Sequence, residues 1–417
     1  MREMRDSGIA WIGAMPRAWK MNTIAQIFLQ VKCKNTGLQE KNLLSLSYGK
    51  VKRKSIDTVE GLLPESFDGY NIIEKDDIVL RLTDLQNDHT SLRVGLAEER
   101  GIITSAYLTI RNRSNFCPKY LYYYLHSFDI AKGFYGMGAG VRQGLNWDGV
   151  KWLKILAPSV PEQERIAAFL DAECAEIDAV LEKTRASIEE YKKLKQAVIT
   201  QAVTKGIRGD RPMKDSGIEW IGEIPAEWNV IRVKQLLKER NERSKEGKEE
   251  PLSMSQKVGL VPTKFLESIP NMASSFVGAK LAYVDDLVFN KLKAHLGVFS
   301  VSRYDGLISP DYAVYCSTGK SNLKYLEYIF KTPQCIGEFR KKSTGIAAGL
   351  MRLYTEGLFS IYLPYPALSE QEEIAEYLNE KCAGIDTLIV KKQQYLIEIE
   401  NYKKSLIYEY VTGKREA

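Results

Sequence analysis

The sequence has little of what builds disulfide frameworks, metal centres or membrane spans. Its six cysteines lie far apart, with no CxxC pair and no His-Cys cluster, so neither a disulfide framework nor a zinc site is expected. The only histidines, His89, His126 and His295, have no obvious nucleophile partner. No apolar run approaches the roughly 18 residues that a membrane span needs, and the N-terminal MREMRDSG lacks the apolar core of a signal peptide. We therefore expect a protein of the reducing cytoplasm with no membrane segment.

Motifs for phosphate binding and catalysis are also scarce. No GxxxxGK[ST] phosphate loop is present, which argues against nucleotide hydrolysis of that class. The stretch GMGAGVRQG, Gly136–Gly144, lacks GxGxxG spacing, so a surface loop is favoured over a cofactor loop, with a loop near a phosphate backbone as the alternative. The acidic pairs Asp76-Asp77 and Asp285-Asp286 could bind a metal, but they precede strand-like runs, where turn or cap roles are commoner. We expect no cofactor, no metal and no catalysis by this chain.

The sequence does contain a long internal repeat. DSGIAWIGAMPRAW, Asp6–Trp19, returns as DSGIEWIGEIPAEW, Asp215–Trp228. EQERIAAFLDAECAEID, Glu162–Asp178, returns as EQEEIAEYLNEKCAGID, Glu370–Asp386, at almost the same offset. The chain is therefore a duplication, and each half consists of a Trp turn, a basic block and an acidic helix. We expect each Trp turn to pack a helix end onto its domain.

The basic blocks of the two halves match far less well. Traces of a common scaffold survive in three places: LSLSYGKV (Leu44–Val51) with LSMSQKVG (Leu252–Gly259), DDIVLR (Asp76–Arg81) with DDLVFN (Asp285–Asn290), and GIITSAYLTI (Gly101–Ile110) with GLISPDYAVY (Gly306–Tyr315). Short β-type runs alternate with turns in both blocks, and helical stretches follow around KYLYYYLHSF and LKYLEYIFKT. Each block is predicted to be a mixed α/β domain, so one scaffold is present twice with different residues.

A coiled-coil seam follows each block, with apolar residues at alternating four- and three-residue spacing. The first seam comprises Leu170, Cys174, Ile177, Leu181, Thr184, Ile188, Tyr191, Lys195, Val198 and Ala202. The second comprises Leu378, Cys382, Ile385, Ile389, Lys392, Leu396, Ile399, Lys403, Leu406 and Tyr410. We expect the two helices to pack on each other, and a two-fold relation between the halves requires them to run antiparallel. Pro161 stands where the second copy has Ser369, so we expect the two helices to start differently.

Positive charge gathers in the two blocks. Residues 20–156 contain 19 Lys and Arg against 14 Asp and Glu, a net +5, and residues 229–364 contain 20 against 13, a net +7. Because the whole chain carries +6, the remaining residues carry −6. Basic blocks attract polyanions, of which nucleic acid is the commonest in a cytoplasm; an ordinary solvated surface is the alternative. The candidate DNA contacts are Tyr48, Lys50, Lys52, Arg53, Lys54, Arg81, Arg142, Lys257, Lys264, Lys291, Lys293, His295, Arg340, Lys341, Lys342 and Arg352.

These patterns predict an α+β protein: two mixed α/β domains in a pseudo-two-fold arrangement, joined by two long helices in an antiparallel coiled coil. The expected segments are an N-terminal Trp turn (1–19), a first α/β domain (20–158), a first long helix (159–206), a linker with the second Trp turn (207–228), a second α/β domain (229–366) and a second long helix (367–417).

The chain resembles the specificity subunits of type I restriction–modification systems. The resemblance rests on DSGIxWIGxxPxxW, on PxQEqxxIAxxLd before a long helix (here PEQERIAAFLD and SEQEEIAEYLN), and on two divergent blocks. It implies two target recognition domains that each read one half of a bipartite, asymmetric DNA site, with the coiled coil as a ruler between the halves. It also implies double-stranded DNA, two methyltransferase subunits and restriction subunits as partners. S-adenosylmethionine and ATP then belong to those partners, consistent with the lack of an NPPY-type methyltransferase motif or a helicase motif here.

Two alternatives stay open at this point. The first is a stand-alone DNA-binding repressor or architectural protein, although a repressor usually obtains two-fold symmetry by forming a homodimer. The second is a self-sufficient nuclease or methyltransferase, which turnover by the pure chain would reveal.

Overall fold

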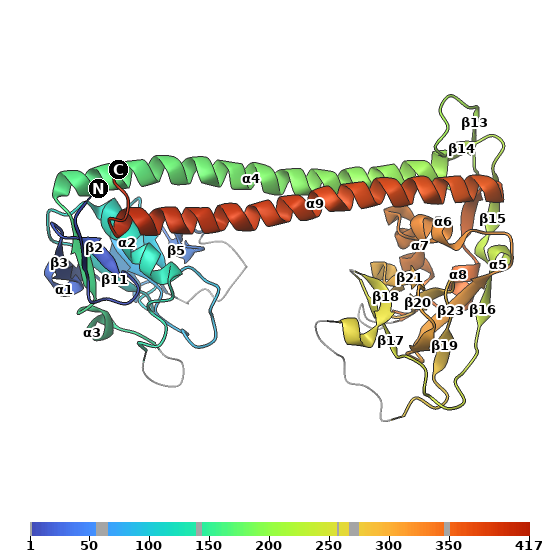
Figure 1. The fold of residues 1–417 in the computed structure, drawn as a ribbon, viewed down its shortest axis with the longest axis horizontal. Coiled ribbons are helices and arrows are strands. Elements are labelled where there is room, and N and C mark those ends of the chain that lie inside the picture. The colour runs from blue at the N-terminus through green and yellow to red at the C-terminus, as the bar shows by residue number, and fades with distance from the viewer. Residues whose placement is uncertain (1, 56–65, 139–143, 257, 267–274, 346–350) are drawn as a thin grey trace. The chain divides into compact units, whose positions relative to one another are not determined.

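The computed structural model describes residues 2–55, 66–138, 144–256, 258–266, 275–345 and 351–417. The chain divides into two units, residues 1–185 with 394–417, and residues 186–393 (Figure 1). The first unit therefore contains both ends of the chain, and its fold is completed by the last residues of the C-terminal helix. No helix among the described residues is both long and apolar enough to cross a membrane.

The first unit consists of short strands, short helices and one end of each long helix. Its elements are β1 (Met4–Asp6), β2 (Ala14–Pro16), β3 (Lys20–Thr23), α1 (Ile24–Ile27), β4 (Phe28–Gln30), β5 (Leu44–Ser47), β6 (Lys50–Arg53), β7 (Asn71–Ile73), β8 (Ile78–Leu80), β9 (Val94–Leu96), β10 (Gly101–Ile103), β11 (Leu108–Asn112), α2 (Pro118–Ile130), α3 (Trp147–Val150), β12 (Lys154–Ala157) and the start of α4 (Val160–Lys205). The end of α9 (Leu368–Val411) also belongs to this unit.

The second unit contains the remaining parts of α4 and α9. Its other elements are β13 (Met213–Asp215), β14 (Glu223–Pro225), β15 (Asn229–Arg232), α5 (Val233–Leu236), β16 (Leu237–Arg240), β17 (Leu252–Ser255), β18 (Gly259–Pro262), η1 (Thr263–Phe265), β19 (Lys280–Ala282), β20 (Leu287–Asn290), η2 (Ala294–Leu296), β21 (Phe299–Val301), β22 (Gly306–Ile308), β23 (Tyr312–Ser317), α6 (Leu323–Phe330), α7 (Pro333–Lys342), α8 (Thr355–Phe359) and β24 (Tyr362–Tyr365).

The two units have the same sheet topology. A four-stranded antiparallel sheet has the order β4-β11-β8-β9 in the first unit and β16-β23-β20-β21 in the second. Hairpins β5–β6 and β17–β18 match, as do the pairs β7–β10 and β19–β22, β3–β12 and β15–β24, and β1–β2 and β13–β14. The predicted α+β class and the prediction of one scaffold present twice are confirmed. Each sheet packs a separate apolar core that also includes the unit's helices.

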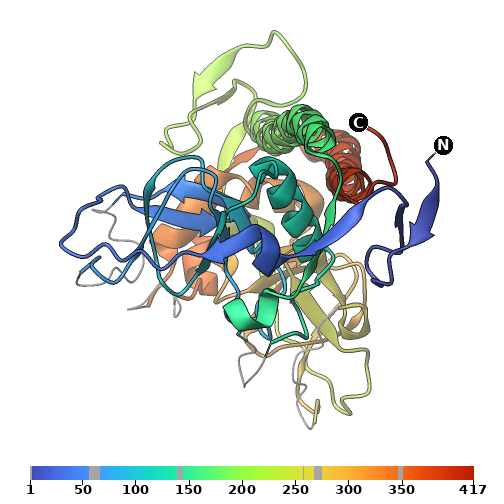
Figure 2. The same ribbon diagram turned by 90° about the vertical axis from the view of Figure 1, so that its left-hand side faces the viewer.

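The segments of α4 and α9 run antiparallel within each unit and lie side by side (Figures 1 and 2). In the first unit, Phe169 stacks on Tyr410 with ring centroids 4.4 Å apart, and Arg185 pairs with Glu400 at 2.6 Å. In the second unit, Arg208 pairs with Glu373 at 2.7 Å. The predicted seam residues lie between the paired helices and are mostly buried. They include Leu170, Cys174, Ile177, Leu181, Ile188, Leu378, Cys382, Leu406 and Tyr410.

Two of the polar interruptions of the seam, Lys195 and Lys403, make cross-helix contacts. Lys195 binds both carboxylate oxygens of Asp386, at 2.7 and 2.6 Å, in the second unit. Lys403 binds Asp178 at 2.6 Å at the equivalent place in the first unit. Buried Thr184 instead donates to the carbonyl of its own preceding turn. A polar residue within an apolar seam fixes helix register, because a shifted register leaves the charge without its partner.

A buried glutamine joins each long helix to its α/β layer. Gln163 accepts the backbone N–H of Cys117 at 2.9 Å and donates to the carbonyl of Pro158 at 3.0 Å. Gln371 makes the equivalent two bonds in the second unit, both at 3.0 Å. Both side chains are fully buried. The glutamine of the repeated motif therefore satisfies backbone groups where the strand, the short helix and the long helix meet.

The Trp turns pack on these same junctions, as predicted. Trp19 donates from Nε1 to Glu162 in the first turn of α4 at 3.2 Å. Trp228 donates to Glu370 in the first turn of α9 at 2.9 Å. Trp11 lies edge-on against aromatic rings of α2, and its copy Trp220 packs against the second core. Each turn thus clamps a long helix to its own unit.

The expectation that the two helices start differently is wrong. The first helix begins at Val160 and the second at Leu368, which are equivalent positions, so Pro161 and Ser369 are both second helical residues. Proline is compatible with the first turn of a helix because the N–H groups there have no intrahelical partner. The exchange therefore leaves the junction unchanged.

The acidic pairs have the turn role favoured above. The first aspartate of each pair lies in a left-handed turn, with φ of 70° and 66°. In the first unit, the second aspartate, Asp77, is buried and accepts both guanidinium bonds of Arg111 at 2.7 Å. In the second unit, Asp286, just before β20, pairs with Arg240 of β16, two strands away in the sheet order. Both carboxylates are therefore used in ion pairs with arginines. No cluster of three potential metal-binding side chains occurs in the described part of the chain.

Candidate nucleic-acid interface

The β5–β6 hairpin presents the first group of predicted contacts. Its two-residue turn, Tyr48-Gly49, has positive φ at both positions, 48° and 75°, as the right-handed twist of a tight hairpin requires. A Cβ at Gly49 would lie 3.1 Å from Leu92, so glycine also allows the turn to approach its neighbour closely. The Tyr48 side chain is 88% exposed at the tip. The geometry places an aromatic ring in solvent on a well-defined turn.

The basic residues of this hairpin differ in whether an acidic side chain of the same unit pairs with them. Strand alternation puts Lys50 and Lys52 on the face opposite the apolar side chain of Val51. Lys50 lies 3.7 Å from Asp178 of α4, and Arg53 makes a two-point ion pair with Glu99. Lys52 is exposed and has no ion-pair partner among the residues that the structure describes. Lys54 follows the strand and is half-buried, and its backbone N–H donates to the carbonyl of Leu43.

A cavity of about 550 Å³ lies between this hairpin, α2 and the long helices of the first unit. His126 lines it, and burial lowers the pKa of this imidazole to about 4, an effect that Lys403 strengthens and Asp178 opposes. Its Nδ1 has no hydrogen-bond partner among the described residues, while its ring stacks on Tyr122. A neutral histidine therefore lies beneath the hairpin that carries the predicted contacts.

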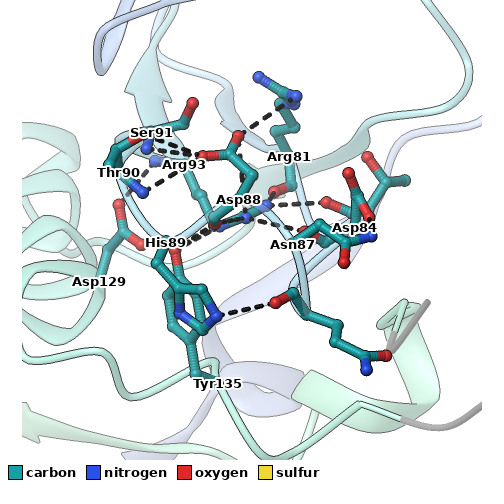
Figure 3. A network of polar contacts seen from close by, with 12 residues as sticks. Arg81, Asp84, Asn87, Asp88, His89, Thr90, Ser91, Arg93, Asp129 and Tyr135 are labelled. Carbon is teal, nitrogen blue, oxygen red and sulfur yellow. Dashed lines mark hydrogen bonds and ion pairs between the residues drawn. The ribbon is translucent and has the colours of Figure 1, made fainter. Parts of the chain in front are cut away.

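Arg81 lies at the base of a second feature, residues 82–92 between β8 and β9, hereafter the amide loop (Figure 3). Arg93, fully buried, is its centre. Its guanidinium donates to the carbonyls of Arg81, Thr83, Asp84 and Asp88 and to the hydroxyl of Tyr135. Arg93 is not among the residues predicted from the sequence, because a buried arginine cannot be distinguished there from a surface one.

Two carboxylates complete this network. Asp88 accepts the backbone N–H groups of Thr90 and Ser91 and lies 3.4 Å from Arg81. Hydrogen bonds from the side chain of Ser91 and, to a smaller extent, from its backbone N–H hold the pKa of Asp88 well below its usual range. Burial raises the pKa of Asp129 to about 6, although the backbone N–H of Arg93 donates to it at 2.6 Å. The predicted contact Arg81 is therefore held in place by the loop rather than free.

The second unit brings most of its predicted contacts together around one loop. Lys291, Lys293 and His295 lie in the connection 291–297 between β20 and β21, hereafter the basic loop. The backbone N–H of Leu353 donates to the carbonyl of Lys291 at 3.0 Å, which places the adjacent Arg352 beside it. Arg352 in turn forms a β-bridge with Thr344, close after the end of α7.

The last turn of α7 carries three further predicted contacts, Arg340, Lys341 and Lys342. All three are exposed, and Lys341 pairs with Glu338 at 2.7 Å. Helix α7 packs against η2 of the basic loop, so these cations lie near that loop in space. Lys264 lies apart from this group, after β18, and pairs with Glu250 at 3.0 Å. Arg142 and Lys257 lie outside the described residues.

Comparisons with known proteins agree with this architecture. No protein-family model matches the chain. A type I restriction enzyme MjaX specificity subunit from Methanocaldococcus jannaschii is 25% identical, over 97% of this chain and 95% of that protein. A chain from a solved structure on complex assembly and conformational transition of the type I R-M system is 14% identical. It has a TM-score of 0.71 and covers 96% of this chain and 99% of its own length.

The crystal structure of the HsdS subunit from Thermoanaerobacter tengcongensis has a TM-score of 0.53 at 14% identity, covering 96% of this chain and 98% of that one. At such identities a structural likeness establishes the fold. The sequence similarity to the M. jannaschii protein extends over both units and both long helices. In sequence and in fold, over nearly its whole length, the chain is thus similar to the specificity subunits of type I restriction enzymes.

Proposed function

We propose that this chain is the DNA-recognition subunit of a type I restriction–modification complex. Its α/β domains, 20–158 and 229–366, each read one half of a bipartite, asymmetric DNA site, and the paired helices 159–206 and 367–417 set the spacing. One observation carries the proposal. The same sheet and the same helix junction occur twice, while the exposed loops on them differ. Two like scaffolds with unlike loops suit a site whose halves differ in sequence.

The predicted contacts divide by chemistry into two kinds. Exposed lysines and arginines, such as Lys52, Lys293 and Arg340, would bind phosphates and fix the position of each domain on the duplex. Arginines held in a defined geometry, such as Arg81 and Arg352, suit guanine edges, where a guanidinium donates two parallel bonds. Tyr48, exposed at the hairpin tip, would pack against sugar or base.

Catalysis belongs to partner subunits in this proposal. Two methyltransferase subunits and the restriction subunits would dock on the complex and supply S-adenosylmethionine and ATP chemistry. The second aspartate of each acidic pair is committed to an ion pair with an arginine. A stand-alone repressor is less well supported, because the two halves of this chain present different loops.

The proposal is tested by co-expressing the chain with the methyltransferase subunit of its host and mapping methylated bases in the genome. A gapped motif with two unlike halves is expected, and methylation should require both proteins. Binding to a symmetric operator without a methyltransferase would favour the repressor. Methylation or cleavage by the pure chain, with magnesium and S-adenosylmethionine, would contradict the non-catalytic role.

A further inference from the structure

The amide loop (82–92) and the basic loop (291–297) occupy the same place in their two sheets. Each connects the third and fourth strands of the sheet order. The backbone N–H of Arg81 donates to Arg93 at 2.8 Å across the base of the first loop, and Asn290 donates to Val298 at 3.1 Å across the base of the second. Position by position, the two loops therefore start and end on equivalent residues. Three of the residues predicted to touch DNA, Lys291, Lys293 and His295, lie in the second loop, so its counterpart becomes a candidate as well.

The two loops differ in how they are built. The basic loop is short, carries Lys291, Lys293 and His295, and is held by backbone bonds at η2. The amide loop is longer and has Arg93 at the position where the basic loop ends on Val298. The buried guanidinium binds four carbonyls of the loop and its base, and the ring of Tyr135 lies 5.1 Å from it (Figure 3). Apolar side chains Leu82 and Leu85 are buried beneath it.

This anchoring fixes the loop before any partner binds. Asp88 closes its outer turn, and His89 stacks on Tyr135 with ring centroids 5.1 Å apart. Lys132 of the α2 end also donates to the carbonyl of His89. An ordered loop loses little conformational entropy on binding, which is what accurate recognition of a rigid duplex requires.

The outward side chains of this loop include two amides and no lysine or arginine. Gln86 is exposed, and its side chain makes no hydrogen bond to any other residue that the structure describes. Asn87, also exposed, donates one N–H to Asp84 at 2.7 Å, which orients the amide and leaves its oxygen as a free acceptor. A glutamine or asparagine amide pairs with adenine in the major groove, donating to N7 and accepting from N6.

We infer that the amide loop is a base-reading element of the first unit, and that Gln86, exposed next to the oriented amide of Asn87, reads an adenine. Arg93 is the positioning residue: it touches no DNA and holds the loop in its reading geometry. The basic loop takes the same place in the second unit with cationic chemistry. This inference rests on the proposed function, because it assigns a contact within the DNA site of the first unit.

The test uses the full chain assembled with its methyltransferase subunits, in wild-type form and as the Gln86→Ala variant. Gln39→Ala is the matched control, since Gln39 is an exposed glutamine of the same unit. Methylome mapping and competition binding to the mapped site are measured. Gln86→Ala should weaken binding by about 5- to 150-fold and relax one adenine position in the half-site of the first unit. Replacing that adenine by 7-deazaadenine, which lacks the N7 acceptor, should weaken wild-type binding but not further weaken Gln86→Ala.

A second variant, Arg93→Lys, tests the positioning role, with thermal unfolding measured to confirm that it folds. It should lower discrimination at the same adenine while Gln86 is still present. The inference is overturned if Gln86→Ala keeps the wild-type motif and affinity, as Gln39→Ala should, or if the half-site of the first unit contains no adenine that responds to it. A wild-type complex that methylates no bipartite motif would instead contradict the proposed function itself.

Discussion

At the scale of single residues, buried polar side chains bond the backbone groups where each long helix meets its α/β domain. Gln163 and Gln371 make the same pair of backbone bonds in the two units. Trp19 and Trp228 donate to Glu162 and Glu370, the residues just before these glutamines. The repeated motifs predicted that the Trp turns pack on the helices, but not the role of the two glutamines. Their partners could not be predicted, because Cys117 and Asn322 lie far away in the sequence and are brought close only by the fold.

Replacing Gln371 by alanine should destabilise the second unit by about 1–3 kcal/mol. The change leaves the backbone N–H of Asn322 and the carbonyl of Pro366 buried without a partner. Glu373→Ala is the control in the same helical turn, because it removes only an exposed ion pair with Arg208, which contributes about 0–1 kcal/mol. Urea unfolding followed by circular dichroism measures both variants. Equal effects of the two changes would argue against the junction role of Gln371.

His126 should make stability depend on pH between its ordinary pKa, 6.5, and its folded value of about 4. Above this window both states are neutral at this residue. As the pH falls through it, only the unfolded state binds the proton, so stability is lost, by up to about 3 kcal/mol. His126→Gln should remove this loss, while the exposed His89→Gln should not. Urea midpoints measured from pH 7 to 4 test this, and parallel pH profiles for wild type and His126→Gln would contradict it.

At the scale of elements, periodicity predicted the long helices and their seam well, because a four-three spacing leaves few alternatives to a paired helix. It predicted the short strands of the scaffold through aligned fragments such as Asp76–Arg81 and Asp285–Asn290. It could not predict the amide loop as a rigid element. The loop is mostly polar and has no helical or strand periodicity, and its order comes largely from one buried arginine whose partners are backbone carbonyls.

The Lys195–Asp386 contact should show coupling in a double-mutant cycle. Lys195→Asp and Asp386→Lys each place like charges across the helix pair, and each should destabilise the protein. Combining them restores opposite charges, with a coupling of about 0.2–1 kcal/mol for such a half-exposed pair. Chemical unfolding of the four proteins measures this coupling. Strict additivity of the two single effects would show that the pair does not act as a register contact.

At the scale of the whole molecule, the charge distribution predicts how binding responds to salt. The two basic blocks carry +5 and +7 in an otherwise acidic chain. Phosphate contacts release counterions, so for roughly 6–10 contacts the affinity of the assembled complex should fall about 10³- to 10⁵-fold between 50 and 200 mM salt. Competition binding over a salt series measures the slope. A flat response would exclude phosphate-led binding.

Replacing residues 20–156 by the equivalent block of a related protein tests the central claim most directly. Methylated positions are mapped across the genome of cells that carry the chimera and the methyltransferase subunits. If each unit reads its own half of the site, one half of the gapped motif changes, while the other half and the spacing remain as in the wild type. A change in both halves, or a single continuous motif, would contradict independent reading by two units on one helical frame.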